Sequence, residues 1–263
     1  MKIAILYICT GIYNKFFEGF YLSCEKFFLA GKAEKKYFVW TDDDGIGEGK
    51  NNVYVIHKEC AGFPADSLFR FEMFLQVEDE LCKFDYVYFF NANAEFLTPV
   101  NEELLPDETG LAMGVWGGKE AKRHPMFYSY ERNRKSLAYI PPFGKNYHLF
   151  MGGLNGGRAK EYLEMCNTLA QNIRDDYNRG IIAIAHDQSH INAYLRIHAC
   201  KIITPEYCWP EDWQAEGFIP KIIFRDKVRL NVYFNKGRDG GLKGKLKKGF
   251  SLMKHAARWY LFI

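Results

Sequence analysis

The chain has 263 residues, of which 48% are hydrophobic and 25% are charged, and its formal net charge is +3. This is a globular composition with ample material for a core, and the length permits one large domain or two small ones. Nucleic-acid binding needs a broad basic face, and neither the net charge nor the charge pattern predicts one.

The seven cysteines are odd in number, widely spaced and form no C-x-x-C pair. They predict reduced, mostly buried thiols in a cytosolic protein, with neither a zinc site nor a disulfide framework. The apolar run of residues 3–9 is too short to span a bilayer and lacks a small-residue cleavage site, so we expect a buried first strand. No longer apolar run follows, and the predicted location is therefore cytoplasmic.

Strand and helix patterns alternate along the chain. We expect strands at residues 3–8, 37–40, 53–56, 86–90 and 202–204, and helices at 13–29, 66–83, 159–175 and 187–198. A glycine-rich segment occupies residues 151–157. The alternation predicts an α/β fold with a mostly parallel central sheet flanked by helices.

One strand ends in two asparagines. The apolar run of residues 86–90 leads directly into Asn91 and Asn93. Side chains spaced i, i+2 on extended chain point the same way, here at the carboxyl end of a strand, where open α/β sheets bind ligands. An amide oxygen lacks the charge that makes a hard-cation site strong, so we expect no metal ion there. An ordinary Asn-rich turn after a strand is the alternative.

The last part of the chain is basic. Residues 236–258 contain eight Lys or Arg and one acid, Asp239, with apolar residues interleaved. This pattern is typical of an interfacial helix on anionic lipid and predicts peripheral contact with the inner membrane face. A solvated tail, or a helix docked on its own domain, explains the pattern equally well.

Four segments carry a family resemblance through their order and spacing. They are residues 10–13 with 24–26, residues 89–96 with Asn91-x-Asn93, residues 130–141, and residues 186–192 with 205–207. Over residues 3–235 the chain resembles the histo-blood-group A and B glycosyltransferases and the α-1,3-galactosyltransferases, in particular their stemless bacterial members. The resemblance implies one GT-A-like domain at 1–235, with a nucleotide half at about 1–95 and an acceptor half at about 96–235. A basic, amphipathic tail at 236–263 follows the domain.

The resemblance also implies a donor site. It places uridine at Ile8, Cys9, Thr10 and Tyr13, and the Asp-x-Asp positions of other members at Asn91 and Asn93. Donor contacts are implied for Arg70 and for Asp187, which could also serve as a helix N-cap. Met151, Gly152 and Gly153 match positions that distinguish donors. In this family Gly at 153 leaves room for an N-acetyl group, whereas Ala favours galactose.

Two departures from the family concern the acceptor and the chemistry. The implied acceptor residues are Trp116, Ala185 and Trp209, and mammalian members have Trp where this chain has Ala185. At Gln188 the family has the Glu that is the candidate nucleophile or cation stabiliser of a retaining transfer. Gln keeps the shape and loses the charge. This predicts an inactivated form, with a natural altered member as the alternative.

The function that the resemblance implies is retaining α-1,3 transfer of GalNAc from UDP-GalNAc to a fucosylated, H-antigen-like β-galactoside. Transfer from UDP-Gal and a catalytically dead sugar-binding protein are the alternatives, and a covalent intermediate or a same-face substitution both stay open. We expect no cofactor and no metal. Lys227, with Arg229 second to it, is expected to reach the diphosphate in place of a metal.

Overall fold

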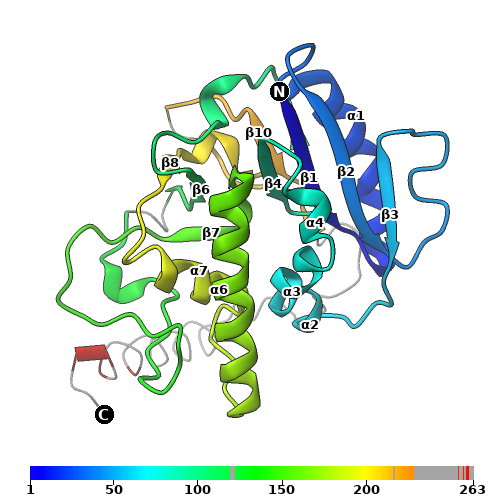
Figure 1. The fold of residues 1–263 in the computed structure, drawn as a ribbon. Coiled ribbons are helices and arrows are strands. Elements are labelled where there is room, and N and C mark those ends of the chain that lie inside the picture. The colour runs from blue at the N-terminus through cyan, green and yellow to red at the C-terminus, as the bar shows by residue number, and fades with distance from the viewer. Residues whose placement is uncertain (119–121, 216, 228–253, 255–256, 258, 261–263) are drawn as a thin grey trace, which may run out of the picture.

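The computed structural model describes residues 1–118, 122–215, 217–227, 254, 257 and 259–260. A central seven-stranded sheet has the order β3-β2-β1-β4-β7-β6-β8, and a three-stranded sheet has the order β5-β10-β9 (Figure 1). The strands are β1 Lys2–Ile8, β2 Glu34–Thr41, β3 Val53–His57, β4 Tyr86–Phe90, β5 Ala94–Phe96, β6 Leu111–Val115, β7 Phe150–Arg158, β8 Lys201–Ile203, β9 Trp209–Pro210 and β10 Ile222–Phe224. The mixed α/β class with a mostly parallel central sheet is confirmed.

Strand β7 breaks the parallel order, because it runs antiparallel to both of its neighbours, β4 and β6. The start of β7 therefore adjoins the end of β4, and the Asn91 N–H donates to the Gly153 carbonyl at 2.8 Å. No strand was expected in this glycine-rich segment. Glycine serves the sheet here because a Cβ at Gly156 would lie 2.3 Å from the Tyr88 ring.

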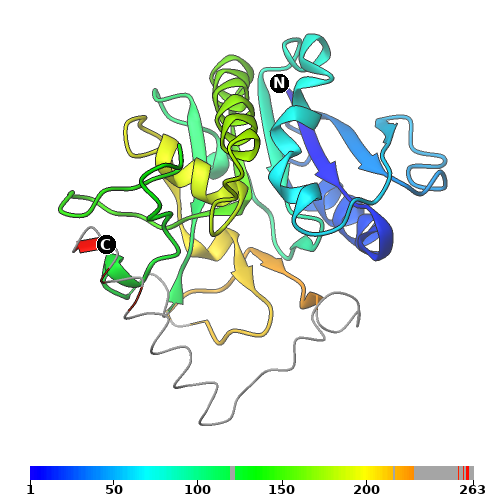
Figure 2. The same ribbon diagram turned by 90° about the horizontal axis from the view of Figure 1, so that it is seen from below.

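Side chains of β1 alternate between two cores, as period-2 geometry requires. Ile3, Ile5 and Tyr7 pack on the side covered by α1 (Phe17–Phe27), whereas Ala4 and Leu6 face the side covered by α3 (Arg70–Leu75) and α6 (Ala159–Asn178). Figures 1 and 2 show the sheet between these two helical layers. This three-layer packing fixes the strand ends that carry the site.

The remaining helices differ from the expectation in detail. The single helix expected over residues 66–83 is wrong, because the backbones of Phe69 and Val77 leave the helical region and divide it. Three short helices result, and the second begins at Arg70. Helix α7 (Asp187–Tyr194) ends four residues before the expected His198. The other helical bounds are α2 Ala65–Leu68, α4 Glu78–Leu81, α7 Asp187–Tyr194, and the 3-10 helices Gly11–Phe16, Glu102–Leu104, Pro125–Phe127 and Pro205–Tyr207.

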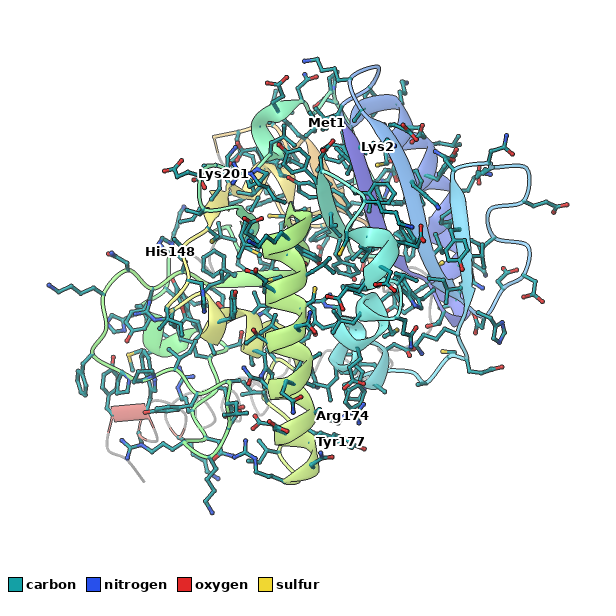
Figure 3. The ribbon with its side chains drawn as sticks, viewed as in Figure 1. Met1, Lys2, His148, Arg174, Tyr177 and Lys201 are labelled. Carbon is teal, nitrogen blue, oxygen red and sulfur yellow. The ribbon has the colours of Figure 1, made fainter. Side chains whose placement is uncertain are left out.

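Helix α6 is tied to α3 near its C-terminal end. Arg174 Nε donates to Glu72 Oε1 at 2.8 Å, and the rings of Phe69 and Tyr177 lie 5.1 Å apart. Figure 3 shows Arg174 and Tyr177 on this lower part of α6. The contact joins the two sequence halves beside the helix that carries Arg70.

Trp259, near the end of the chain, packs against the segment that contains Ile140 and Tyr147. Trp259 is 1% exposed, its Nε1 donates to the Ile140 carbonyl at 2.7 Å, and its ring lies 5.7 Å from that of Tyr147. Of the alternatives for the tail, packing against the chain's own domain is therefore the one observed at Trp259. The basic segment 236–253 and Arg229 lie outside the described residues. Of the helices that the structure describes, none has the length and apolarity needed to cross a bilayer.

Candidate active site

A cavity of about 410 Å³ opens where β4 ends and β7 and α7 begin. Most residues of the predicted site line it. These are Ile8, Thr10, Tyr13, Arg70, Asn91, Trp116, Met151, Gly152, Gly153, Ala185, Asp187, Gln188 and Lys227. Cys9, Asn93 and Trp209 are buried and are not among the residues that line the cavity.

The end of β1 forms one wall. Thr10 Oγ1 donates to Asp66 Oδ2 at 2.9 Å, and the Gly11 N–H donates to Asp42 Oδ1 at 2.8 Å. Gly11 has a φ of +57°, a conformation that favours glycine. These bonds fix the strand-to-helix turn that carries Tyr13 into the cavity.

Arg70 and Asp187 form a buried ion pair that joins α3 to α7. The two residues are 4% and 6% exposed, and the guanidinium also lies 4.4 Å from the Phe89 ring centroid. Burial raises the pKa of Asp187, and the Arg70 guanidinium opposes that shift. Arg70 Nε is buried and has no hydrogen-bond partner among the described residues. His186, and not Asp187, is the N-cap residue of α7.

Gln188 projects into the cavity from the first turn of α7. Its Oε1 accepts hydrogen bonds from Trp116 Nε1 and from the Gly152 N–H, both at 3.2 Å. Its Nε2 donates to Ser129 Oγ at 3.5 Å. The two N–H donors would equally hold a carboxylate, so the amide keeps the geometry of that group without its negative charge.

Motif residues that do not line the cavity hold α7 in place. The Asn192 side chain accepts from the Phe150 N–H at 2.9 Å and donates to the Phe150 carbonyl at 2.8 Å. Glu131 Oε2 accepts from the Ile184 N–H at 2.8 Å. These bonds fix α7 against β7 and order the segment that leads to Asp187.

The two asparagines are bonded to each other. Asn91 Nδ2 donates to Asn93 Oδ1 at 3.0 Å, and Asn93 Nδ2 donates to the Arg225 carbonyl at 2.6 Å. Only Asn91 reaches the cavity. The two carboxylates of the cavity, Asp66 and Asp187, are both paired with cations. This donor set does not fit a hard divalent cation, and the described residues contain no group of three His, Cys, Asp or Glu placed to hold a metal.

The two glycines at the start of β7 face different groups. A Cβ at Gly152 would lie 2.7 Å from the Arg70 guanidinium and 2.9 Å from the Asp187 carboxylate. A Cβ at Gly153 would lie 3.0 Å from the Phe224 ring and 3.4 Å from Asn91. Gly152 therefore lets the ion pair approach the strand, and Gly153 lets the Phe224 ring pack closely against it.

Lys227 lines the cavity beside Tyr13. Its Nζ lies 5.2 Å from the Tyr13 ring centroid, and no carboxylate of the described residues forms an ion pair with it. Burial lowers the pKa of Lys227 to about 8, and the nearby charge of Arg70 adds to the effect. An anion bound in the cavity would meet this ammonium group.

Several residues that line the cavity were not predicted from the sequence as site residues. They include Phe63, Asp66, His186 and Phe224. Phe63 is 63% exposed, and its ring lies 4.7 Å from that of His186. Asp66 precedes Arg70 by four residues, and this spacing could have marked it as a neighbour of the site. Phe63 and Phe224 carry no comparable signal, because aromatic residues occur throughout the chain.

Comparison with known proteins assigns the family. The model of glycosyltransferase family 6 matches residues 1–231. The chain belongs to glycosyltransferase family 6. This family 6 protein is thereby a UDP-sugar-dependent glycosyltransferase, with a nucleotide-sugar donor and a glycan acceptor.

Three relatives illustrate the range of the family. The O-antigen biosynthesis glycosyltransferase WbnI of Escherichia coli is 36% identical over 89% of this chain and 99% of its own length. Histo-blood group ABO system transferase 1 of Rattus norvegicus is 28% identical over 76% of this chain and 58% of its own. Human globoside alpha-1,3-N-acetylgalactosaminyltransferase 1 is 23% identical over 80% and 62%, respectively. The chain thus spans nearly all of the bacterial relative and about three fifths of the two animal relatives.

Proposed function

We propose that this family 6 glycosyltransferase transfers GalNAc from UDP-GalNAc to a fucosylated β-galactoside, with retention and without a metal ion. The observation that supports the proposal is the convergence of three kinds of group in one cavity. They are the turn of Thr10 and Tyr13 for uridine, the Arg70–Asp187 pair for sugar hydroxyls, and the ammonium group of Lys227 for the diphosphate.

The donor sugar would lie against β7. The Arg70–Asp187 pair lines the cavity and would offer a guanidinium donor and a carboxylate acceptor for hydroxyl groups. Gly153 lines the cavity at the position where the family resemblance implies room for an N-acetyl group, which favours GalNAc over galactose. The α-1,3-N-acetylgalactosaminyl transfer in the name of the human relative is consistent with this donor. UDP-Gal is the alternative donor.

The chemistry would depend on charge at two places. As the bond from the anomeric carbon to UDP breaks, negative charge grows on the diphosphate, where Lys227 would stabilise it in place of a metal. Positive charge grows on the sugar ring, where a carboxylate at position 188 would oppose it. Gln188 offers only an amide dipole. We therefore expect the protein to bind its donor and to turn over slowly.

The acceptor would enter beside Trp116 and Ala185, on the side of the cavity next to Gln188. Trp209 would act indirectly, because its ring is buried against Trp213 and Phe218. The neutral amide of Gln188 favours one further candidate function, a sugar-binding protein that uses the same cavity and no longer transfers.

The test is product analysis with the unaltered protein and the Gln188→Glu variant. Each is incubated with UDP-GalNAc or UDP-Gal and with β-galactosides that carry or lack a 2-linked fucose, and products are identified by mass and linkage. Addition of an N-acetylhexosamine to the fucosylated acceptor supports the proposal. Addition of a hexose would instead select UDP-Gal. No transfer by either protein, with donor and acceptor still bound, would select the sugar-binding function.

A further inference from the structure

Asn93 has a position that the donor-contact role does not explain. It is 4% exposed, and the cavity wall includes Asn91 but not Asn93. Its side chain uses its hydrogen-bonding groups within the protein, since Oδ1 accepts from Asn91 and Nδ2 donates to the Arg225 carbonyl. A residue bonded in this way has little left to offer a diphosphate.

The partner of Asn93 lies two residues before Lys227. Asn93 and Arg225 are joined twice, through the side-chain bond of 2.6 Å and through the Arg225 N–H, which donates to the Asn93 carbonyl at 2.8 Å. These bonds continue beyond β10 and connect the turn after β4 to the segment that carries the lysine.

Carboxylates hold the other side of the same segment. The Arg225 guanidinium donates to Glu95 at 2.7 Å and to Glu211 at 2.7 Å, and the Asp226 N–H donates to Glu211 at 2.9 Å. The backbone at residues 225 and 226 is thus fixed on both sides. We call these four bonded residues, Asn93, Glu95, Glu211 and Arg225, the frame. The direction in which the backbone leaves the frame decides where the Lys227 ammonium group lies.

We infer that Asn93 is a positioning residue, which holds Lys227 at the diphosphate through the Asn91–Asn93–Arg225 chain of hydrogen bonds. This inference rests on the proposed function. It gives the second amide a role that a carboxylate cannot fill, because the contact with the Arg225 carbonyl needs an N–H donor. An aspartate at 93 would set a carboxylate oxygen against that carbonyl and would repel it.

The test is a double-mutant cycle between Asn93→Asp and Lys227→Ala, read by calorimetric binding of UDP and of uridine without metal. Asn93→Asp should weaken UDP binding about tenfold, the size typical of a broken buried hydrogen bond, and should leave uridine binding within about twofold. In the Lys227→Ala background the same change should cost less than about twofold, because the group that Asn93 positions is gone.

A purely structural role predicts another pattern, in which Asn93→Asp weakens UDP equally in both backgrounds or weakens uridine as much as UDP. Either result would overturn the inference. If Asn93→Asp does not fold, Glu211→Gln loosens the same frame and should show the same dependence on Lys227. UDP binding that is insensitive to both variants overturns the positioning role alone. Failure of the unaltered protein to bind UDP overturns the proposed function as well.

Discussion

The two sides of the cavity differ in how they handle charge. On the side proposed for the diphosphate, Lys227 follows a frame of four residues, in which Asn93, Glu95 and Glu211 are each bonded to Arg225. On the sugar side, Gln188 has an equally defined place but meets only neutral partners. Under the proposed function, the chain would keep a cation for the leaving group and would lack an anion at position 188 for the reacting carbon. Binding and turnover should therefore respond to different substitutions.

The largest effect should come from restoring the anion. Gln188→Glu should raise kcat by about 10²–10³, the range typical of one transition-state charge contact. Its affinity for UDP-GalNAc should change little, because Arg70, Asp187 and Lys227, which also line the cavity, would contact other parts of the donor. Turnover assays and calorimetry on the pair of proteins check this. Equal kcat values would place the catalytic carboxylate elsewhere.

Removing the cation should act on binding. Lys227→Ala should weaken UDP binding by about 10- to 100-fold, because charge-assisted contacts with phosphate are the strong ones. Uridine, which lacks the diphosphate, should bind as before and serves as the control ligand. Unchanged turnover of Gln188→Glu when Lys227→Ala is added would exclude the lysine from the diphosphate site.

The pH dependence of binding should identify the same lysine. Burial lowers the pKa of Lys227 to about 8, so the free protein loses this positive charge as the pH rises through that value. UDP favours the charged lysine, and its affinity should fall about tenfold between about pH 7 and pH 9. Lys227→Ala should give a flat profile over this range. A fall that persists in that variant would assign the titration to another group.

A smaller effect is expected at Gly153, where β7 lines the cavity. Gly153→Ala should shift the preference from UDP-GalNAc toward UDP-Gal by about tenfold, since one methyl group against an acetamide acts as a steric filter. The matched control is Gly19→Ala in α1, where a Cβ would meet only Glu95 Oε2 at 3.9 Å. Competition between the two donors measures the ratio, and a shift of the same size in the control would argue against a local effect.

The smallest expected effect is that of a chelator. Turnover of Gln188→Glu should be the same with EDTA as with Mn²⁺, because two amides cannot offset the dehydration of a hard cation. Loss of activity in EDTA and its return with Mn²⁺ would show that the diphosphate side depends on a metal.

Local pattern predicted the architecture well where apolar periodicity was strong. The strands at residues 3–8 and 86–90 and the long helix from Ala159 lie where expected. The pattern failed in two places. Strand β7 has few side chains to alternate, and its pairing depends on Tyr88 in a distant strand. The helix over 66–83 is divided at Phe69 and Val77, a tertiary outcome that helical spacing does not encode.

The candidate site shows the same limit at the level of single contacts. The order and spacing of the motifs predicted one shared site, and the residues of that site that line the cavity include Thr10, Arg70, Asn91, Asp187 and Gln188. They could not show that Asn93 points to the Arg225 carbonyl, because that bond joins positions 132 residues apart. They also could not separate Asp187 from a helix cap, since capping depends on the φ and ψ of His186.

The buried Trp259 has a practical consequence for handling the protein. A chain shortened before this residue would lose the buried indole ring and would expose the recess among Tyr130, Ile140 and Tyr147 that the ring fills. An affinity tag is better placed at Met1, which is 44% exposed at the start of β1 (Figure 3). A tag added after Ile263 would begin four residues from that recess.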